Sequence, residues 1–167
     1  VDLDAMQEIE QIPMGPFPLN AAALFPRSIA ASTNAILFSS VPLAPAGLAP
    51  GNGSIWQLSR ITHTAFPRPN LGLGFNNLVQ GRNMLIAPEN GSAIVTVEGN
   101  GTLRMYDPFA DTFTVTRGAA VPALRGTVSA AADGSFYVVD NLVFNSVLGA
   151  QGAIAPSAVG LPGAQAN

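Results

Sequence analysis

One short sequence pattern occurs twice at an offset of 43 residues. Arg82 stands eight residues before Asn90, and Arg125 stands eight residues before Asp133. Each of these turn residues is followed by Gly-Ser and then by an apolar run. Self-similarity at such a period indicates related structural units packed side by side, because one unit alone cannot bury its apolar face. The chain is therefore expected to fold as a series of similar β-units.

A third copy of the pattern lies earlier in the chain. It begins at Arg27, reaches its turn residue Asn34 after seven residues and lacks the glycine. A second match relates NGSIWQLSRITHTAFPR, residues 52–68, to NGTLRMYDPFADTFTVTR, residues 100–117. The two matches together predict four short antiparallel strands for each unit. The Asn-Gly and Asp-Gly pairs favour two-residue hairpin turns of type I′, in which both central residues adopt positive φ.

Val, Ile, Thr, Phe and Tyr gather in short runs bounded by Gly, Asn, Asp or Pro, as they do in strands joined by tight turns. The predicted strands are 28–32, 35–41, 54–59, 61–66, 83–87, 92–98, 102–107, 112–116, 126–131, 135–140 and 142–148. QGAIAPS, residues 151–157, is interpreted as a weak last strand. Four-stranded units of about 40 to 50 residues match the period of a propeller blade.

Two of these hairpins resemble known repeats. VSAAADGSFYVVD, residues 128–140, resembles the inner strands of bacterial YVTN-like β-propeller repeats, and MYDPFADTFTVTR, residues 105–117, resembles the outer hairpin of kelch-like blades. The resemblance covers residues 23–155. It implies an all-β, β-propeller-like fold of about three four-stranded antiparallel blades in a secreted bacterial protein. A β-sandwich built from the same hairpins is the alternative.

Three blades are fewer than the four to eight of typical propellers. The chain is therefore expected to be part of a longer protein, to assemble with further copies, or to stack its units in another way. The predicted organisation has an acidic, proline-rich N-terminal segment, a β-repeat domain and a C-terminal tail. These parts are residues 1–20, 21–155 (units at about 23–68, 73–117 and 118–155) and 156–167. Residues 1–12 fit either a short amphipathic helix or a frayed acidic terminus.

The composition and net charge of the chain argue against several classes of function. Charged residues make up 10% of the chain, against about 25% in typical domains, so part of the surface is expected to be covered by a partner. A net charge of −3 and seven widely spaced arginines argue against a nucleic-acid surface. Cysteine is absent, which excludes disulfides and thiolate metal sites. No apolar run is long enough for a membrane helix. The resemblance to secreted bacterial repeat proteins implies an extracellular or periplasmic location.

Five residues are the candidate binding residues of this sequence: Trp56, His63, Tyr106, Asp140 and Asn141. Trp56 and Tyr106 would bind a sugar ring or a protein partner if they are exposed, and would otherwise belong to the core. His63 is the one histidine, and alternation in strand 61–66 would place it on a face with Ile61 and Ala65.

The pair Asp140-Asn141 follows a predicted inner strand. In lactonase-like propellers, acidic and Asn side chains from several blades converge on a central metal, so the resemblance makes this pair the best local candidate for such a role. Oxygen ligands of this kind suit Ca²⁺. Asn52, Asn90 and Asn100 each begin an N-x-[ST] sequon. These are either glycan acceptors or simply the preferred residues of tight turns.

The function expected from these observations is a non-catalytic extracellular binding or scaffolding module with a protein or carbohydrate partner. Its affinity would come from loops on one face, because blades packed side by side leave the loops free to vary. The first alternative is a structural subunit of a homomeric or filamentous assembly. The second is a metal-dependent lactonase-like hydrolase.

Overall fold

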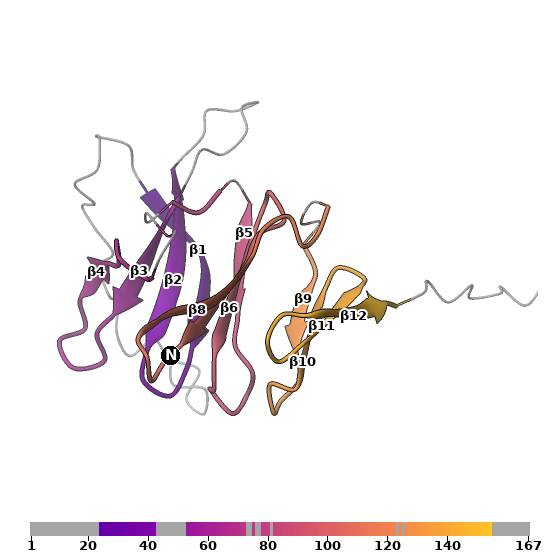
Figure 1. Cartoon of the computed structure of the whole chain (residues 1–167). Coiled ribbons are helices and arrows are strands. Elements are labelled where there is room, and N and C mark those ends of the chain that lie inside the picture. The colour runs from indigo at the N-terminus through magenta and orange to yellow at the C-terminus, as the bar shows by residue number, and fades with distance from the viewer. Residues whose placement is uncertain are drawn as a thin grey trace, which may run out of the picture.

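The structure is a computed structural model, and all twelve of its described secondary-structure elements are β-strands (Figure 1). It describes residues 24–42, 53–72, 75, 78–80, 82–122, 124 and 126–154. The predicted N-terminal segment and C-terminal tail lie outside the described residues. The all-β prediction is confirmed.

The strands form three four-stranded antiparallel sheets, and in each sheet the spatial order follows the chain. The first sheet contains β1 (Leu24–Ala31), β2 (Ile36–Pro42), β3 (Ser54–Leu58) and β4 (Ala65–Pro67). The second contains β5 (Asn83–Ile86), β6 (Ile94–Glu98), β7 (Leu103–Asp107) and β8 (Thr112–Arg117). The third contains β9 (Val128–Ala130), β10 (Phe136–Val139), β11 (Leu142–Asn145) and β12 (Ala150–Ala153). The expectation of three four-stranded antiparallel sheets is confirmed.

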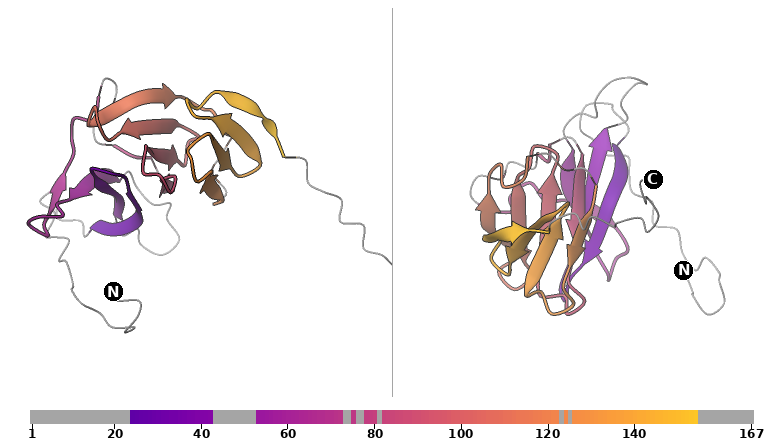
Figure 2. Two further views of the ribbon diagram at one scale, coloured as in Figure 1. Left: turned by 90° about the horizontal axis from the view of Figure 1, so that it is seen from below. Right: turned by 90° about the vertical axis from the view of Figure 1, so that its right-hand side faces the viewer.

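The three sheets follow one another along an arc, with their first strands toward the inside (Figure 2). β1 lies beside β5, and β5 contacts β9. Ser28 ties the first two of these strands together, because its Oγ donates to the Leu85 carbonyl at 3.3 Å and accepts the Leu85 N–H at 2.9 Å. This bond pair fixes the middle of β1 next to β5.

The apolar core consists of two clusters, one between each pair of successive sheets. Leu37, Ile55 and Ile94 belong to the cluster between the first and second sheets. Tyr137 and Phe144 belong to the cluster between the second and third sheets. Side chains along a strand point alternately to the two faces of its sheet, so the second sheet contributes to both clusters.

Strand β6 shows this alternation most clearly. Ile94 packs in the first cluster, whereas Val95 and Val97 pack in the second. All five residues of β6 are consequently buried. A strand buried on both faces carries a continuous apolar run instead of a polar–apolar alternation, which explains the sequence IVTV at this place.

The turns of the repeated hairpins differ from the prediction. In a type I′ turn both central residues would have positive φ, but Asn90, Asn100 and Asp133 do not have it, and only the glycine that follows each of them does. The glycine N–H groups instead close turns onto the carbonyl three residues before, namely Gly91 to Pro88, Gly101 to Glu98 and Gly134 to Ala131. These are type I-like turns followed by a left-handed glycine.

The side chains explain that choice of turn. Asn90, Asn100 and Asp133 each accept the backbone N–H two residues further on with Oδ1, at distances of 2.9 to 3.0 Å. Such a side-chain bond imitates a backbone turn and favours Asn or Asp there. The two described sequon residues, Asn90 and Asn100, therefore have a structural role in their turns.

The prediction of a strand at 61–66 is wrong for most of its length. The Ser59 N–H donates to the Thr64 carbonyl at 2.9 Å and the His63 N–H to the Ser59 carbonyl at 3.0 Å, so a turn precedes the short β4. Ser59 Oγ also accepts the N–H groups of Ile61 and Thr62. A serine that accepts from the N–H groups two and three residues further on stabilises a turn against a strand.

Candidate functional site

Trp56 lies inside the first sheet and not on an exposed face. Its side chain is 3% exposed, and the indole Nε1 donates to Ser40 Oγ at 3.1 Å and to Ser54 Oγ at 2.9 Å. The Phe38 ring stacks on it with ring centroids 6.3 Å apart. The structure thus uses this tryptophan for packing and gives its polar N–H two partners within the protein.

Tyr106 is likewise buried, with 1% of its surface exposed. Its hydroxyl donates to Asp111 Oδ1 at 2.6 Å, and that carboxylate pairs with Arg68 at 2.9 Å. Burial, together with the hydrogen bond to Asp111, raises the pKa of Tyr106 to about 12. Arg68 follows β4, so this chain of contacts joins the outer strands of the first sheet to the β7–β8 turn of the second.

His63 lies apart from the other predicted site residues. It is exposed in the turn before β4, in the left-handed region with φ of 53°. Among the residues that the structure describes, no three His, Asp or Glu side chains come together in the way a metal site would require. The sequence predicts no resident metal, and the alternative of a Ca²⁺ site at Asp140 and Asn141 stays a hypothesis.

Asp140 and Asn141 form the two-residue loop between β10 and β11, where Val139 pairs with Leu142. Asp140 has a φ of 54°, the left-handed geometry that tight hairpins need. Its N–H donates to the Thr127 carbonyl at 2.7 Å, and its Oδ1 accepts the Thr127 N–H at 3.3 Å. The loop is thereby fastened to the start of β9.

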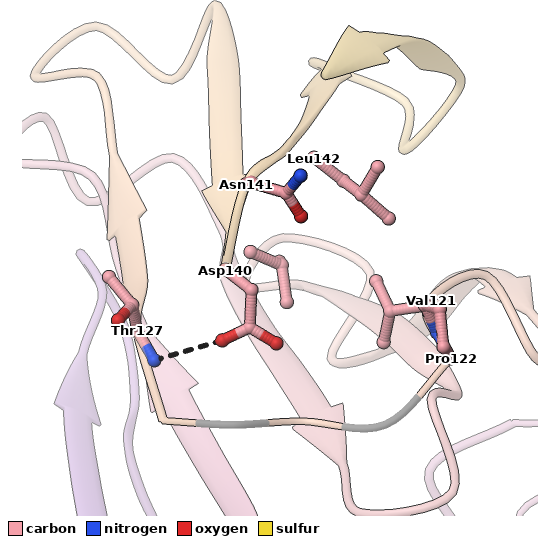
Figure 3. Close-up of a pocket in the computed structure, with 7 residues that line it drawn as sticks. Val121, Pro122, Thr127, Asp140, Asn141 and Leu142 are labelled. Atoms are coloured by element: carbon pink, nitrogen blue, oxygen red, sulfur yellow. Dashed lines mark hydrogen bonds between the residues drawn. The ribbon is translucent and has the colours of Figure 1, made fainter. Parts of the chain in front are cut away.

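This loop borders an open hollow of about 450 Å³ (Figure 3). Figure 3 shows Thr127 and the Val121–Pro122 segment on opposite sides of Asp140. The described residues that line it are Val121, Pro122, Thr127, Val139, Asp140, Asn141 and Leu142. The structure therefore brings two of the five predicted residues together in one cavity and adds neighbours that sequence reasoning did not select.

The wall formed by Val121 is held by close backbone packing. The Val121 N–H donates to the Gly101 carbonyl at 3.3 Å, and the Val121 side chain is 2% exposed in the second core cluster. Gly101 has a φ of +84°, and a Cβ on it would overlap the Val121 carbonyl oxygen. Only glycine fits there, so the NGT turn of the second sheet positions one side of the hollow.

A second hollow of about 350 Å³ lies beside the middle of β1 and the start of β5. The described residues that line it are Arg27, Ser28, Arg82, Asn83, Met84, Leu124 and Gly126. The two hollows flank the segment that leads into β9, since the second contains Gly126 and the first contains Thr127. The middle of β1 and the starts of β5 and β9 thus contribute to one face.

The opposite ends of these strands carry the repeated turns, which contact one another. The Thr33 N–H donates to the Gly91 carbonyl at 3.1 Å, and the Asn90 N–H donates to the Ala132 carbonyl at 3.0 Å. Asn90 Nδ2 also donates to the Asp133 carbonyl at 2.7 Å. These bonds join the three sheets at the end away from the hollows.

Among the described residues, three aromatic side chains that were not predicted as site residues are exposed. They are Phe66 (40%), Phe109 (79%) and Phe136 (47%). None of them lines either hollow. Their exposure was not predictable from residue type, because two other aromatic residues in strands, Trp56 and Tyr106, are buried.

No protein-family model matches the chain, and no curated protein is significantly similar to it. The described residues include no helix of the length and apolarity that crossing a membrane requires. The description of the fold and of the candidate site therefore depends only on the residues and contacts given above.

Proposed function

We propose that the chain is a non-catalytic extracellular or periplasmic binding or scaffolding module built from propeller-like blades. It binds a protein or carbohydrate partner at the face formed by the middle of β1 and the starts of β5 and β9. The observation that carries this proposal is the pair of adjacent hollows at that face, lined by residues of all three sheets and of the segments joining them. Ligand sites are commonly concave and lined by apolar groups with a few polar groups between them.

The sequence resemblance to kelch-like and YVTN-like repeats agrees with this architecture. Successive four-stranded sheets with neighbouring first strands and apolar layers between them are the elements of a propeller. In such an arrangement the sheets give rigidity, and the connections supply the contacts that select a ligand. The Asp140-Asn141 loop is one of these connections.

Asn141 is the best residue for a test because it is exposed at the tip of its loop and lines the hollow. We expect Asn141→Ala to weaken ligand binding without changing the melting temperature. Asn70→Ala is the matched control, because Asn70 is also an exposed asparagine in a connection between strands and lines neither hollow. Both variants are compared with the natural chain by calorimetric titration against a panel of neutral and acidic oligosaccharides and peptides.

Tighter binding of one ligand class by the natural chain and by Asn70→Ala than by Asn141→Ala supports the proposal. Equal binding by all three proteins places the ligand elsewhere and contradicts it. If no member of a broad panel binds, the hollow is not a recognition site for these classes and the assembly function below takes precedence.

A second candidate, a subunit of a homomeric assembly, is favoured by the outer face of the third sheet. Ala93 and Val95 are buried between the second and third sheets, at 5% and 0% exposure. The residues 43 positions later, Phe136 and Val138, lie on the far side of the third sheet, where Phe136 is 47% exposed. The face of the second sheet that packs on the third sheet is thus buried, whereas the corresponding face of the third sheet is open.

The occupant of this face would be a sheet of a second copy, since the chain already forms the corresponding packing twice within itself. Phe136→Ser is expected to reduce the mass of the assembly measured by light scattering after size exclusion. Phe109→Ser removes an even more exposed phenylalanine from the β7–β8 turn and serves as the control. A natural chain that is monomeric at micromolar concentration would count against this second function.

A further inference from the structure

Arg27 and Arg82 hold corresponding places in the sequence repeat and line the same hollow. Each stands at the start of a repeat unit, before the turn residue by seven or eight positions. Arg27 lies in β1 and Arg82 directly before β5, and both side chains are exposed. Because β1 lies beside β5, the two arginines at corresponding positions of the repeat line the same hollow.

These two arginines differ from the other arginines that the structure describes. Arg68 and Arg104 form ion pairs with carboxylates. Arg60 and Arg117 donate to backbone carbonyls, of Ser32 at 2.9 Å and of Val147 at 3.2 Å. Within the described part of the chain, the Arg27 and Arg82 side chains have no such partner, and they are the two that share the hollow.

The backbone around the pair is firmly placed. Arg27 is the extra residue of a β-bulge in β1, because Pro26 pairs with Ser40 and Ser28 already pairs with Ser39. Bulges redirect a side chain out of the regular ladder. Behind Arg82, Gly99 packs so closely that a Cβ on it would lie 2.8 Å from the Arg82 carbonyl oxygen.

The remaining described lining is mixed: Ser28 and Asn83 are polar, whereas Met84 and Leu124 are apolar. Asn83 is a fully buried amide beside Arg82. Gly126 contributes no side chain, and a Cβ on it would meet no atom of the other described residues within 4 Å, its two chain neighbours aside. The chain as a whole carries a net charge of −3. Because the net charge of the protein is negative, an anion is attracted to this pair of arginines and is repelled by the protein as a whole.

We propose that this hollow binds the oxyanion group of a ligand, a carboxylate or a phosphate, between the guanidinium groups of Arg27 and Arg82. The planar guanidinium fork matches both groups through paired N–H···O bonds. The inference rests on the proposed function and deepens it, because it assigns an acidic ligand to the binding face. The other hollow, with Asn141, would contact the rest of that ligand.

The test uses the full chain and titrates it by calorimetry with inorganic phosphate, with glucuronate and with neutral glucose. We expect saturable binding of at least one of the two anions and none of glucose. Arg27→Gln and Arg82→Gln should each weaken anion binding by about tenfold or more, since a charge-assisted hydrogen bond contributes a factor of that order. Tighter binding of phosphate or of glucuronate identifies the class.

Arg117→Gln is the matched control, because it removes the same charge from an exposed arginine in the outer strand β8. Arg82→Lys keeps the charge and should still lose affinity, because an ammonium cannot form the paired bonds. Absence of saturable anion binding, or an equal loss in Arg117→Gln, overturns the proposal. If a neutral ligand binds in a manner that depends on Asn141 while both anions fail, only the anion site is refuted and the binding module stands.

Discussion

The replacement Gly101→Ala tests how the wall of the Asp140-Asn141 hollow is built. The new methyl group would overlap the Val121 carbonyl oxygen, and the residue would have to keep a φ of +84°. The Val121 carbonyl must therefore move away, and it can do so only by displacing the segment that carries Val121 and Pro122. By disturbing the contact between Gly101 and Val121, the substitution should both destabilise the fold and change the shape of the hollow.

The expected loss of stability follows from three contributions. A non-glycine residue in the left-handed conformation costs about 1–2 kcal/mol. The hydrogen bond from the Val121 N–H to the Gly101 carbonyl contributes about 1 kcal/mol and would be lost. Partial withdrawal of the buried Val121 side chain from the core adds up to about 2 kcal/mol. Gly101→Ala should therefore lower the free energy of unfolding by about 4 kcal/mol.

Thermal and urea unfolding followed by circular dichroism measure this loss, which should lower Tm by more than about 10 °C. Gly118→Ala is the matched control, because a Cβ on Gly118 meets no atom within 4 Å. That variant should unfold like the natural chain or slightly later. Equal stability of the two variants would refute the close packing of Gly101 on Val121 and, with it, the described wall of the hollow.

Three further substitutions test other parts of the structure by the same unfolding assays. Tyr106→Phe removes the hydroxyl that donates to Asp111 and should cost about 1–2 kcal/mol. The pKa of Tyr106 is raised from 10.0 to about 12, so the stability that its neutral hydroxyl contributes is complete below pH 10 and is lost as the pH rises to about 12. The free energy of unfolding of Tyr106→Phe should therefore fall less steeply between pH 10 and 12 than that of the natural chain. An unchanged pH dependence would contradict the raised pKa. Glu98→Ala leaves Arg104, 14% exposed, without its carboxylate and should cost about 3 kcal/mol; a neutral effect would show that the pair is not buried in solution. Phe144→Ala empties a site of 1% exposure between the second and third sheets and should cost about 3–5 kcal/mol, whereas a loss below about 1 kcal/mol would contradict that packing.

The all-β architecture was predictable because its signals are local. The apolar run at Ala93–Val97 and its counterpart at Phe136–Val139 are each preceded by an Asn-Gly or Asp-Gly turn, and both fall on strands. The geometry of those turns was not predictable from the residue pairs alone. The Asn and Asp side chains accept a neighbouring N–H, and this contact selects a turn in which only glycine has positive φ.

The error at residues 61–66 has a comparable cause. RITHTAF alternates apolar and polar residues as a strand does, but Ile61 is 92% exposed and Ser59 holds the segment in a turn. A serine that accepts from nearby N–H groups is a weak signal in a sequence, whereas alternation is a strong one. The boundary of β4 therefore could not be predicted from the pattern.

The candidate site was predictable only in part. Asp140 and Asn141 follow a strand and lie in a loop, where binding residues are common, and they line a hollow. Trp56 and Tyr106 were selected by residue type, which does not distinguish a core aromatic from an exposed one. Arg27 and Arg82 mark the repeat in the sequence, but their proximity arises from the packing of β1 beside β5.

The most direct test of this account is the distance between residues 27 and 82 in solution. Because the chain has no cysteine, Arg27→Cys/Arg82→Cys can be spin-labelled at these two positions alone and measured by pulsed electron resonance. A binding face built from the middle of β1 and the start of β5 predicts one narrow distribution at short distance, well below that of an Arg27→Cys/Arg117→Cys pair. A broad distribution, or one as long as that of the control pair, would show that the sheets do not meet in this way and would contradict the proposed binding face.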